Sequence, residues 1–252
     1  MMSTHATASK QWTELELNLL PIENNVRLRG LEVTRLDTFI DAAFAFVLTL
    51  LVISFDQIPS NYDEMIVAVK RIPGFSASFS VLMIFWLSHR GWSRKYGLES
   101  GRSIFLSLAI IFMILVYIYP LRIIFEAMFW SLSSGYFTAD FRVQSIYELR
   151  GMIVFYSSGA FMMAVLFCDL YRTALNRKSS LALNAAEQLV TKRFIRSWLV
   201  GLLFSILSLV LACSLPDDLV ALAGYVYLFV YPAVWWVSRL AKAEITAPVN
   251  TG

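Results

Sequence analysis

Charged side chains are scarce in this chain of 252 residues. Lysine, arginine, aspartate and glutamate make up only 15% of it, while 58% of the residues are hydrophobic. A soluble protein carries about 25% charged residues, so this sequence has too few polar side chains to cover a water-soluble domain. The composition excludes an ordinary soluble enzyme and a disordered or fibrous chain, and it favours an integral membrane protein.

Cysteine and histidine are also rare. Cys168 and Cys213 lie far apart within apolar runs and have no CxxC spacing, so neither a disulfide framework nor a zinc site is indicated. His5 and His89 are the two histidines of the chain, and two cannot form a multi-histidine metal site within one subunit. We therefore expect no cofactor.

Catalytic motifs are missing as well. The sequence contains no glycine-rich phosphate loop, no HExxH and no GxSxG. An active site would have to be assembled from Asp41, Glu148, Asp169 and hydroxyl groups. We expect that the protein is not an enzyme, and the alternative is a membrane enzyme.

Long apolar runs are what the chain has in abundance. A bilayer core of about 30 Å needs roughly 20 apolar residues in a helix, and six stretches qualify: 39–55, 72–88, 103–121, 151–168, 197–215 and 219–238. We predict an all-α integral membrane protein with six transmembrane helices over residues 35–240. An N-terminal segment, 1–34, and a C-terminal tail, 241–252, flank this domain, and residues 181–196 are expected to form a cytosolic helix before the fifth span.

Basic residues concentrate on one side of the predicted membrane. If the N-terminus is cytoplasmic, most of the 21 lysines and arginines fall in the inner segments, as the positive-inside rule requires. The first 30 residues contain three glutamates and no long apolar run, so we expect no signal peptide. We therefore predict a multi-pass protein with both termini in the cytoplasm. The basic runs suit anionic lipid headgroups better than nucleic acid.

Asp41 is an ionisable residue inside the first predicted span. Such groups are costly at membrane depth and mark either a function or a specific buried pairing. Because the second span runs inward, Trp86 and His89 should reach the depth of Asp41. We expect Asp41, Arg35 and His89 to join the first two helices, and the alternative is a catalytic or proton-relay role.

An apolar stripe lies on the first span opposite Asp41. At about 100° per residue, Phe46, Leu50 and Ile53 lie about 140°, 180° and 120° round the helix from Asp41. Such a stripe is typical of ordinary packing or lipid contact. It is also compatible with a hydrophobic constriction, which gates channels by dewetting.

Short motifs in the first three spans resemble those of a known family. Residues 35–42 read Arg-Leu-Asp-Thr-Phe-Ile-Asp-Ala, and Thr-Leu-Leu-Val follows at 49–52. The second span carries Ser-Phe at 78–79, then Trp86 and His89, and the third ends at Pro120. This pattern resembles the transmembrane protein 175 family, which comprises lysosomal and endosomal potassium channels and their bacterial relatives.

The resemblance implies a homotetramer of the six-span bacterial type, in the bacterial plasma membrane. Four copies of the first helix would surround a central pore that passes potassium as a leak, with membrane lipids, potassium ions and other copies of the chain as partners. The pore would be lined by Phe46, Thr49, Leu50 and Ile53. The family's polar motif network would comprise Arg35, Phe39, Asp41, Trp86, His89 and Ser107.

Three positions depart from the family pattern. Ile40 stands where the family has serine, Ser107 where an asparagine is expected, and Phe46 is bulkier than the isoleucine or leucine of the family's constriction. Two alternatives to a potassium leak therefore stay open. One is a pore that passes protons or conducts only after a signal, and the other is a non-conducting membrane scaffold or sensor with the same fold.

Overall fold

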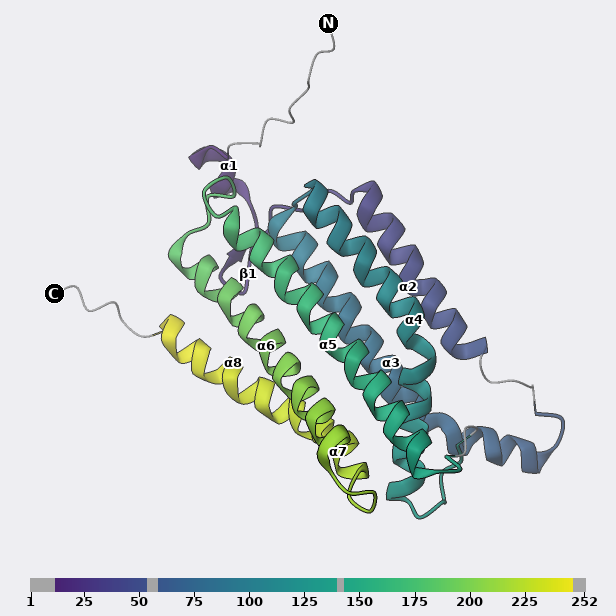
Figure 1. The fold of residues 1–252 in the computed structure, drawn as a ribbon. Coiled ribbons are helices and arrows are strands. Elements are labelled where there is room, and N and C mark those ends of the chain that lie inside the picture. The colour runs from purple at the N-terminus through teal and green to yellow at the C-terminus, as the bar shows by residue number, and fades with distance from the viewer. Residues whose placement is uncertain (1–11, 54–58, 140–142, 247–252) are drawn as a thin grey trace, which may run out of the picture.

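Long helices dominate the computed structural model, and they run side by side between the two ends of the bundle (Figure 1). The structure describes residues 12–53, 59–139 and 143–246. The helices are α1 (Glu14–Leu19), α2 (Arg35–Ile53), α3 (Tyr62–Tyr96), α4 (Gly101–Leu132), α5 (Ile146–Asn176), α6 (Ala185–Ser214), α7 (Ala221–Tyr225), the 3-10 helix η1 (Val226–Phe229) and α8 (Val230–Thr246).

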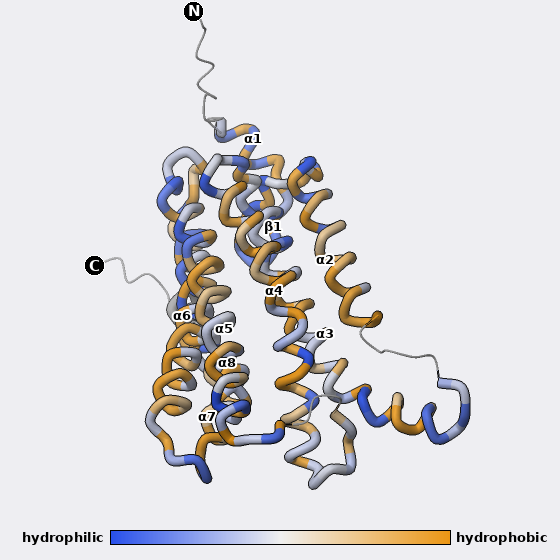
Figure 2. The backbone as a smooth tube through the Cα atoms, turned by 45° about the vertical axis from the view of Figure 1, so that its right-hand side comes forward, coloured by the Kyte–Doolittle hydropathy of each residue, from blue (hydrophilic) through white to orange (hydrophobic). Residues whose placement is uncertain are grey.

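Among the described residues, six helical segments are long and apolar enough to cross a membrane, as the sequence predicts: α2, α3, α4, α5, α6 and the segment Ala221–Leu240. Apolar residues fill their middle parts and hydrophilic residues gather toward the ends of the bundle (Figure 2). The helix expected at residues 181–196 begins later, at Ala185, and continues without a break into the fifth span as α6, while residues 181–184 lie outside it. The chain is therefore a multi-pass helical membrane protein.

Several helices extend beyond the predicted apolar runs because polar side chains cap them. The side chain of Asn61 accepts a hydrogen bond from the backbone N–H of Glu64 and so starts α3 ten residues before the apolar run. Gly97 ends α3 in the left-handed conformation, with φ at 54°. Pro73 lies inside α3, and the first part of this helix runs across the end of the bundle before the helix bends (Figure 1).

The sixth predicted span is not one continuous helix. It is divided into α7, η1 and α8. Pro232 has no N–H to donate to the carbonyl of Leu228, so a regular α-helix is interrupted at this point.

The helices pack in a defined order. α5 and α6 form a central pair, α8 packs on α6, and α2 packs on α3 and α4 at the opposite edge of the bundle (Figure 1). Aromatic rings fill the core between them: Phe167 stacks on Trp198 with ring centroids 4.2 Å apart, and Trp92 and Tyr171 are almost fully buried. Helix α2 thus has neighbours within the subunit on one side.

The description all-α needs one correction. A small antiparallel hairpin, β1 (Ile22–Glu23) and β2 (Val26–Arg27), precedes α2. Asn24 and Asn25 join the strands with φ at 51° and 65°, which is the geometry of a two-residue type I′ turn. Asparagine tolerates this left-handed backbone better than most residues, so the turn follows directly from the local sequence.

Candidate functional site: helix α2 and its polar contacts

Helix α2 has one buried face and one exposed face. Ile40, Phe44, Val47 and Leu51 are buried in the core. On the other face, the exposed fractions of Phe39, Phe46 and Ile53 are 54%, 57% and 66%. These three residues recur every seven positions, so they share one face of the helix. Since α2 lies at the edge of the bundle, this face points away from the subunit.

The residues predicted to line a pore fall largely on this exposed face. Phe46, Thr49 and Ile53 are exposed, and Leu50 is partly buried at its border. The hydroxyl of Thr49 donates to the carbonyl of Ala45 at 2.9 Å, which satisfies this polar group within the helix. Phe46, Thr49, Leu50 and Ile53 are therefore available to contact another subunit, lipid or a pore.

Asp41 joins α2 to α3, but through a different partner from the expected one. The indole Nε1 of Trp86 donates to Oδ1 of Asp41 at 2.8 Å. Arg90 lies over the Trp86 ring, 5.2 Å from its centroid. The prediction that Asp41 links the first two membrane helices is correct, whereas the expected partners, Arg35 and His89, are replaced by an indole.

His89 faces α4 instead of α2. Its Nε2 lies 2.9 Å from the hydroxyl of Ser107, and both residues are buried. Ser107 stands at the position where the family resemblance leads us to expect asparagine, and its hydroxyl still provides a hydrogen-bonding partner for the imidazole. The predicted network is thus divided into two links, one from α3 to α2 and one from α3 to α4.

A second aspartate, Asp37, lies in the first turn of α2 and forms hydrogen bonds there. It was not among the predicted site residues. Ser93 of α3 donates its hydroxyl to Oδ1 of Asp37 at 2.6 Å. The other carboxylate oxygen accepts from the hydroxyl of Thr34 at 3.1 Å, and the Asp37 N–H donates back to Thr34. The local signal was the spacing Thr34-x-x-Asp37, which resembles a capping box. Phe39 and Arg35 lie on the exposed side of this same turn.

Polar contacts to α3 therefore occur at two successive turns of α2. Asp37 and Asp41 lie four residues apart on α2, and their partners Ser93 and Trp86 lie seven apart on the antiparallel α3. Both contacts lie near the N-terminal end of α2, whereas Phe46 and Ile53 lie further along the helix. The arrangement fixes one end of α2 and leaves an apolar surface beyond it.

A cavity lies elsewhere in the subunit. It has a volume of about 640 Å³ between α4, α5 and the α7–η1 region, and its lining includes Ile124, Met128, Ile153 and Tyr225. No residue of α2 is among the described residues that line it. This cavity is therefore separate from the exposed face of α2.

Comparisons with known proteins give a consistent result. The model of the family described as endosomal/lysosomal potassium channel TMEM175 matches residues 35–120. A protein of Marivirga tractuosa named "Potassium channel" is 31% identical over 230 residues, which cover 87% of this chain and 92% of that protein. The chain also resembles the crystal structure of a variant of the potassium channel MtTMEM175 in complex with a nanobody–MBP fusion protein, with 27% identity and a TM-score of 0.75. That match covers 88% of this chain and 99% of the other.

Proposed function

The chain belongs to the TMEM175 family of endosomal/lysosomal potassium channels, and from this premise we propose that it forms a homotetrameric potassium leak channel lined by α2. A leak channel conducts without an applied stimulus. The family is one of ion channels, so the proposal includes no catalytic role and no cofactor. Potassium is the permeant ion, and the other partners are identical subunits and membrane lipids.

The observation that carries the proposal is the exposed face of α2. Phe46, Thr49 and Ile53 point away from the subunit, while Val47 and Leu51 hold the opposite face in the core. A single subunit does not enclose these exposed side chains. If four subunits assembled around an axis beside α2, the four copies of this face would meet at that axis.

A pore built in this way would have apolar rings. With a rise of 1.5 Å per residue, the rings of Phe46, Leu50 and Ile53 would be stacked about 6 Å and about 4.5 Å apart along α2. Narrow apolar rings do not hold a stable column of water, so an ion must lose part of its hydration to pass. The sequence has no TVGYG segment, and this constriction would set both the conductance and the ion preference.

The proposed orientation follows from the charges at the two ends of the bundle. The end at which α2 begins and α3 ends carries Arg90, Arg94 and Lys95. The opposite end carries Asp63, Glu64 and few basic residues. We place the basic end in the cytoplasm of a bacterial cell, with the protein in the plasma membrane and both termini inside.

One observation favours a second function, that of a non-conducting scaffold or sensor. Phe46 is larger than the isoleucine or leucine of the family's constriction, and four phenyl rings could close the pore. The departure at Ile40 has a different explanation: Ile40 is only 1% exposed and packs in the core, while Asp41 is hydrogen-bonded to Trp86. The Ile40 position therefore contributes to packing rather than to the polar link.

Ion flux from purified protein in liposomes tests the proposal. We expect potassium flux without a stimulus, a smaller sodium flux, and cross-linked species of up to four subunits in mild detergent. Proton flux without potassium flux would support a proton pore instead. A protein that forms tetramers but conducts no ion would support the scaffold, and a monomer under all conditions would contradict the pore itself.

A further inference from the structure

Residues 22–34 cross one end of the bundle directly before α2 (Figure 1). The hairpin β1–β2 forms the first part of this segment, and the chain then passes the end of α3 and the start of α6. Val26 and Leu28 are buried, although the segment lies outside the apolar spans. The segment is therefore packed onto the helices and is part of the folded subunit.

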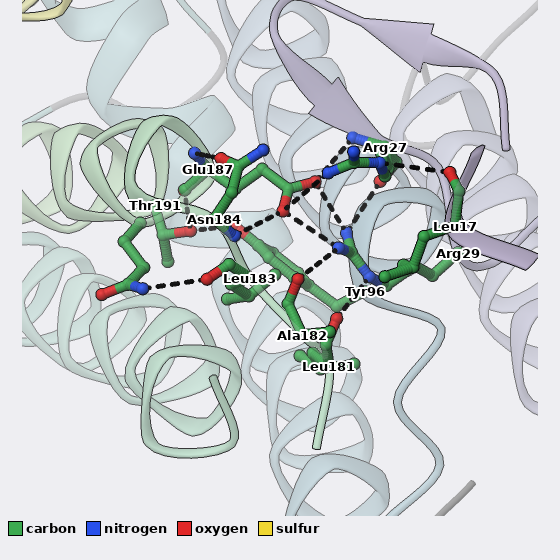
Figure 3. A network of polar contacts seen from close by, with 11 residues as sticks. Leu17, Arg27, Arg29, Tyr96, Leu181, Ala182, Leu183, Asn184, Glu187 and Thr191 are labelled. Carbon is green, nitrogen blue, oxygen red and sulfur yellow. Dashed lines mark hydrogen bonds and ion pairs between the residues drawn. The ribbon is translucent and has the colours of Figure 1, made fainter. Parts of the chain in front are cut away.

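A buried ion pair holds the segment against α6. The side chains of Arg29 and Glu187 are both fully buried. Nη1 and Nη2 of Arg29 each lie 3.0 Å from a different carboxylate oxygen of Glu187, and Nε donates to the carbonyl of Leu181 at 2.8 Å (Figure 3). The backbone N–H of Arg27 donates to the same carboxylate at 2.9 Å. A planar guanidinium suits this paired geometry, and a lysine would not reproduce it.

The same segment lies directly against the end of α3. The N–H of Gly30 donates to the carbonyl of Arg94 at 3.0 Å. A Cβ atom at Gly30 would come within 2.3 Å of the carbonyl oxygen of Ser93, so the close approach requires glycine. Ser93 therefore touches the segment with its backbone, while its hydroxyl binds Asp37 at the start of α2.

A further buried contact connects the ends of α3 and α6 beside the ion pair. The hydroxyls of Tyr96 and Thr191 are 2.7 Å apart, and Thr191 also donates to the carbonyl of Glu187 at 2.7 Å (Figure 3). The N-terminal segment, α3 and α6 thus meet in one buried polar cluster, which includes Arg29, Tyr96, Glu187 and Thr191. Since the cluster is shielded from water, each of its polar groups relies on the others for its hydrogen bonds.

We propose that Arg29 and Glu187 are positioning residues for the pore, which fix the inner end of α2 through the N-terminal segment. Only residues 31–34 separate Gly30 from the start of α2 at Arg35, and the five Cα–Cα steps from Gly30 to Arg35 span at most about 18 Å. The location of Gly30 therefore limits where α2 can begin. This inference rests on the proposed function, because it requires α2 to line the pore.

Loss of the ion pair should release the segment. A buried charge without its partner is strongly unfavourable, so Arg29 without the Glu187 carboxylate would move toward water and take the segment with it. Helix α2 would then keep the links of Asp37 to Ser93 and of Asp41 to Trp86, but would lose the restraint that precedes them. The four copies of Phe46 would be aligned less tightly, and ion preference should fall.

The test compares Glu187→Gln with Glu126→Gln in the full-length protein. Glu126 is buried and forms an ion pair with Arg122, at 2.7 Å. Both residues lie toward the C-terminal end of α4. Both variants therefore remove one buried negative charge, but only Glu187 contacts the N-terminal segment. Three properties are measured: thermal unfolding, amide hydrogen exchange of residues 26–30, and the ratio of potassium to sodium flux in liposomes.

We expect Glu187→Gln to speed amide exchange in residues 26–30 and to lower the flux ratio by about fivefold or more. Glu126→Gln should lower thermal stability without either effect. The conservative variant Glu187→Asp keeps the charge and should retain more of the flux ratio than Glu187→Gln. If Glu187→Gln does not fold, Arg29→Lys serves in its place, because it keeps a cation but loses the paired geometry.

Two outcomes would overturn the inference: faster exchange with an unchanged flux ratio, or an equal fall in the ratio for Glu126→Gln. Phe46→Ala, measured in the same liposomes, separates these outcomes from failure of the proposed function. If Phe46→Ala changes the flux ratio and the Glu187 variants do not, only the positioning role is wrong. If neither changes it, the assignment of α2 to the pore is wrong.

Discussion

Replacement of Phe46 by alanine distinguishes a pore-lining side chain from a packed one. Phe46 is 57% exposed in the subunit, so the truncation should cost about 1 kcal/mol of unfolding free energy. A fully buried phenylalanine would cost about 3–5 kcal/mol. If four Phe46 rings form the narrowest part of the pore, their removal should raise potassium flux by about tenfold or more, which corresponds to a barrier lowered by about 1.4 kcal/mol.

Two variants serve as controls for this change. Val47 is 1% exposed and lies about 100° further round α2, so Val47→Ala should cost about 2 kcal/mol in stability and leave ion preference unchanged. Phe112, on α4, is 65% exposed. Phe112→Ala is therefore the same substitution at a similarly exposed position outside α2. Positions 46 and 47 should therefore show opposite patterns, with a large flux effect at one and a larger stability effect at the other.

The assay measures potassium and sodium flux from liposomes that contain equal amounts of cross-linkable tetramer. Thermal unfolding of each variant is followed in parallel. Equal flux changes at positions 46 and 47 would refute the pore-lining assignment. So would a gain of flux in Phe112→Ala that matches the gain in Phe46→Ala. Loss of tetramer without a change in flux per tetramer would show that Phe46 packs between subunits.

Two further predictions concern the links of α3. Trp86→Phe removes the N–H that donates to Asp41. Because this carboxylate is exposed in the subunit, we expect the unfolding free energy to fall by about 1 kcal/mol or less in thermal unfolding experiments. A larger fall than that of Ser107→Ala would contradict the assignment of an exposed link between Trp86 and Asp41. Ser107→Ala leaves the buried Nε2 of His89 without its hydroxyl partner and should cost about 1–3 kcal/mol. Ser107→Asn should retain the stability, and equal losses in both variants would show that packing, rather than the hydrogen bond, is what the serine provides.

The six membrane helices could be predicted from the sequence because lipid leaves few alternatives. A helix that crosses a bilayer needs a long apolar run, and every backbone polar group must be paired within it. The helix ends follow other rules. Asn61 starts α3 well before the apolar run, and Pro232 interrupts the last span. Capping and proline effects are local, and a hydropathy pattern does not contain them.

The sequence predicted the depth at which the polar residues of α2 and α3 meet, but not which side chains form hydrogen bonds with each other. The antiparallel course of the first two spans brings Trp86 and His89 to the level of Asp41. Which of them meets the carboxylate depends on the rotation of α3 about its axis, since residues three apart differ by about 60° in direction. Asp37 was signalled by its spacing from Thr34. No local pattern could have shown the pair of Arg29 and Glu187, which lie 158 residues apart in sequence.

Exposed apolar side chains on α2 do not by themselves require a pore, because lipid is as apolar as a phenylalanine ring. The polar residues of the same helix provide the stronger argument. Asp41 is exposed in the isolated subunit, and Oδ1 of its carboxylate accepts a hydrogen bond from Trp86. A charge that faces hydrocarbon is costly, whereas a charge that faces a water-filled vestibule is not. Asp41 lies about 140° round α2 from Phe46, and Trp86 of α3 binds it, so its carboxylate is directed to the side of α2 near α3 and not to the ring of Phe46. The exposure of Asp41 in the subunit therefore favours water or a neighbouring subunit beside this end of α2 over a surface that contacts lipid alone.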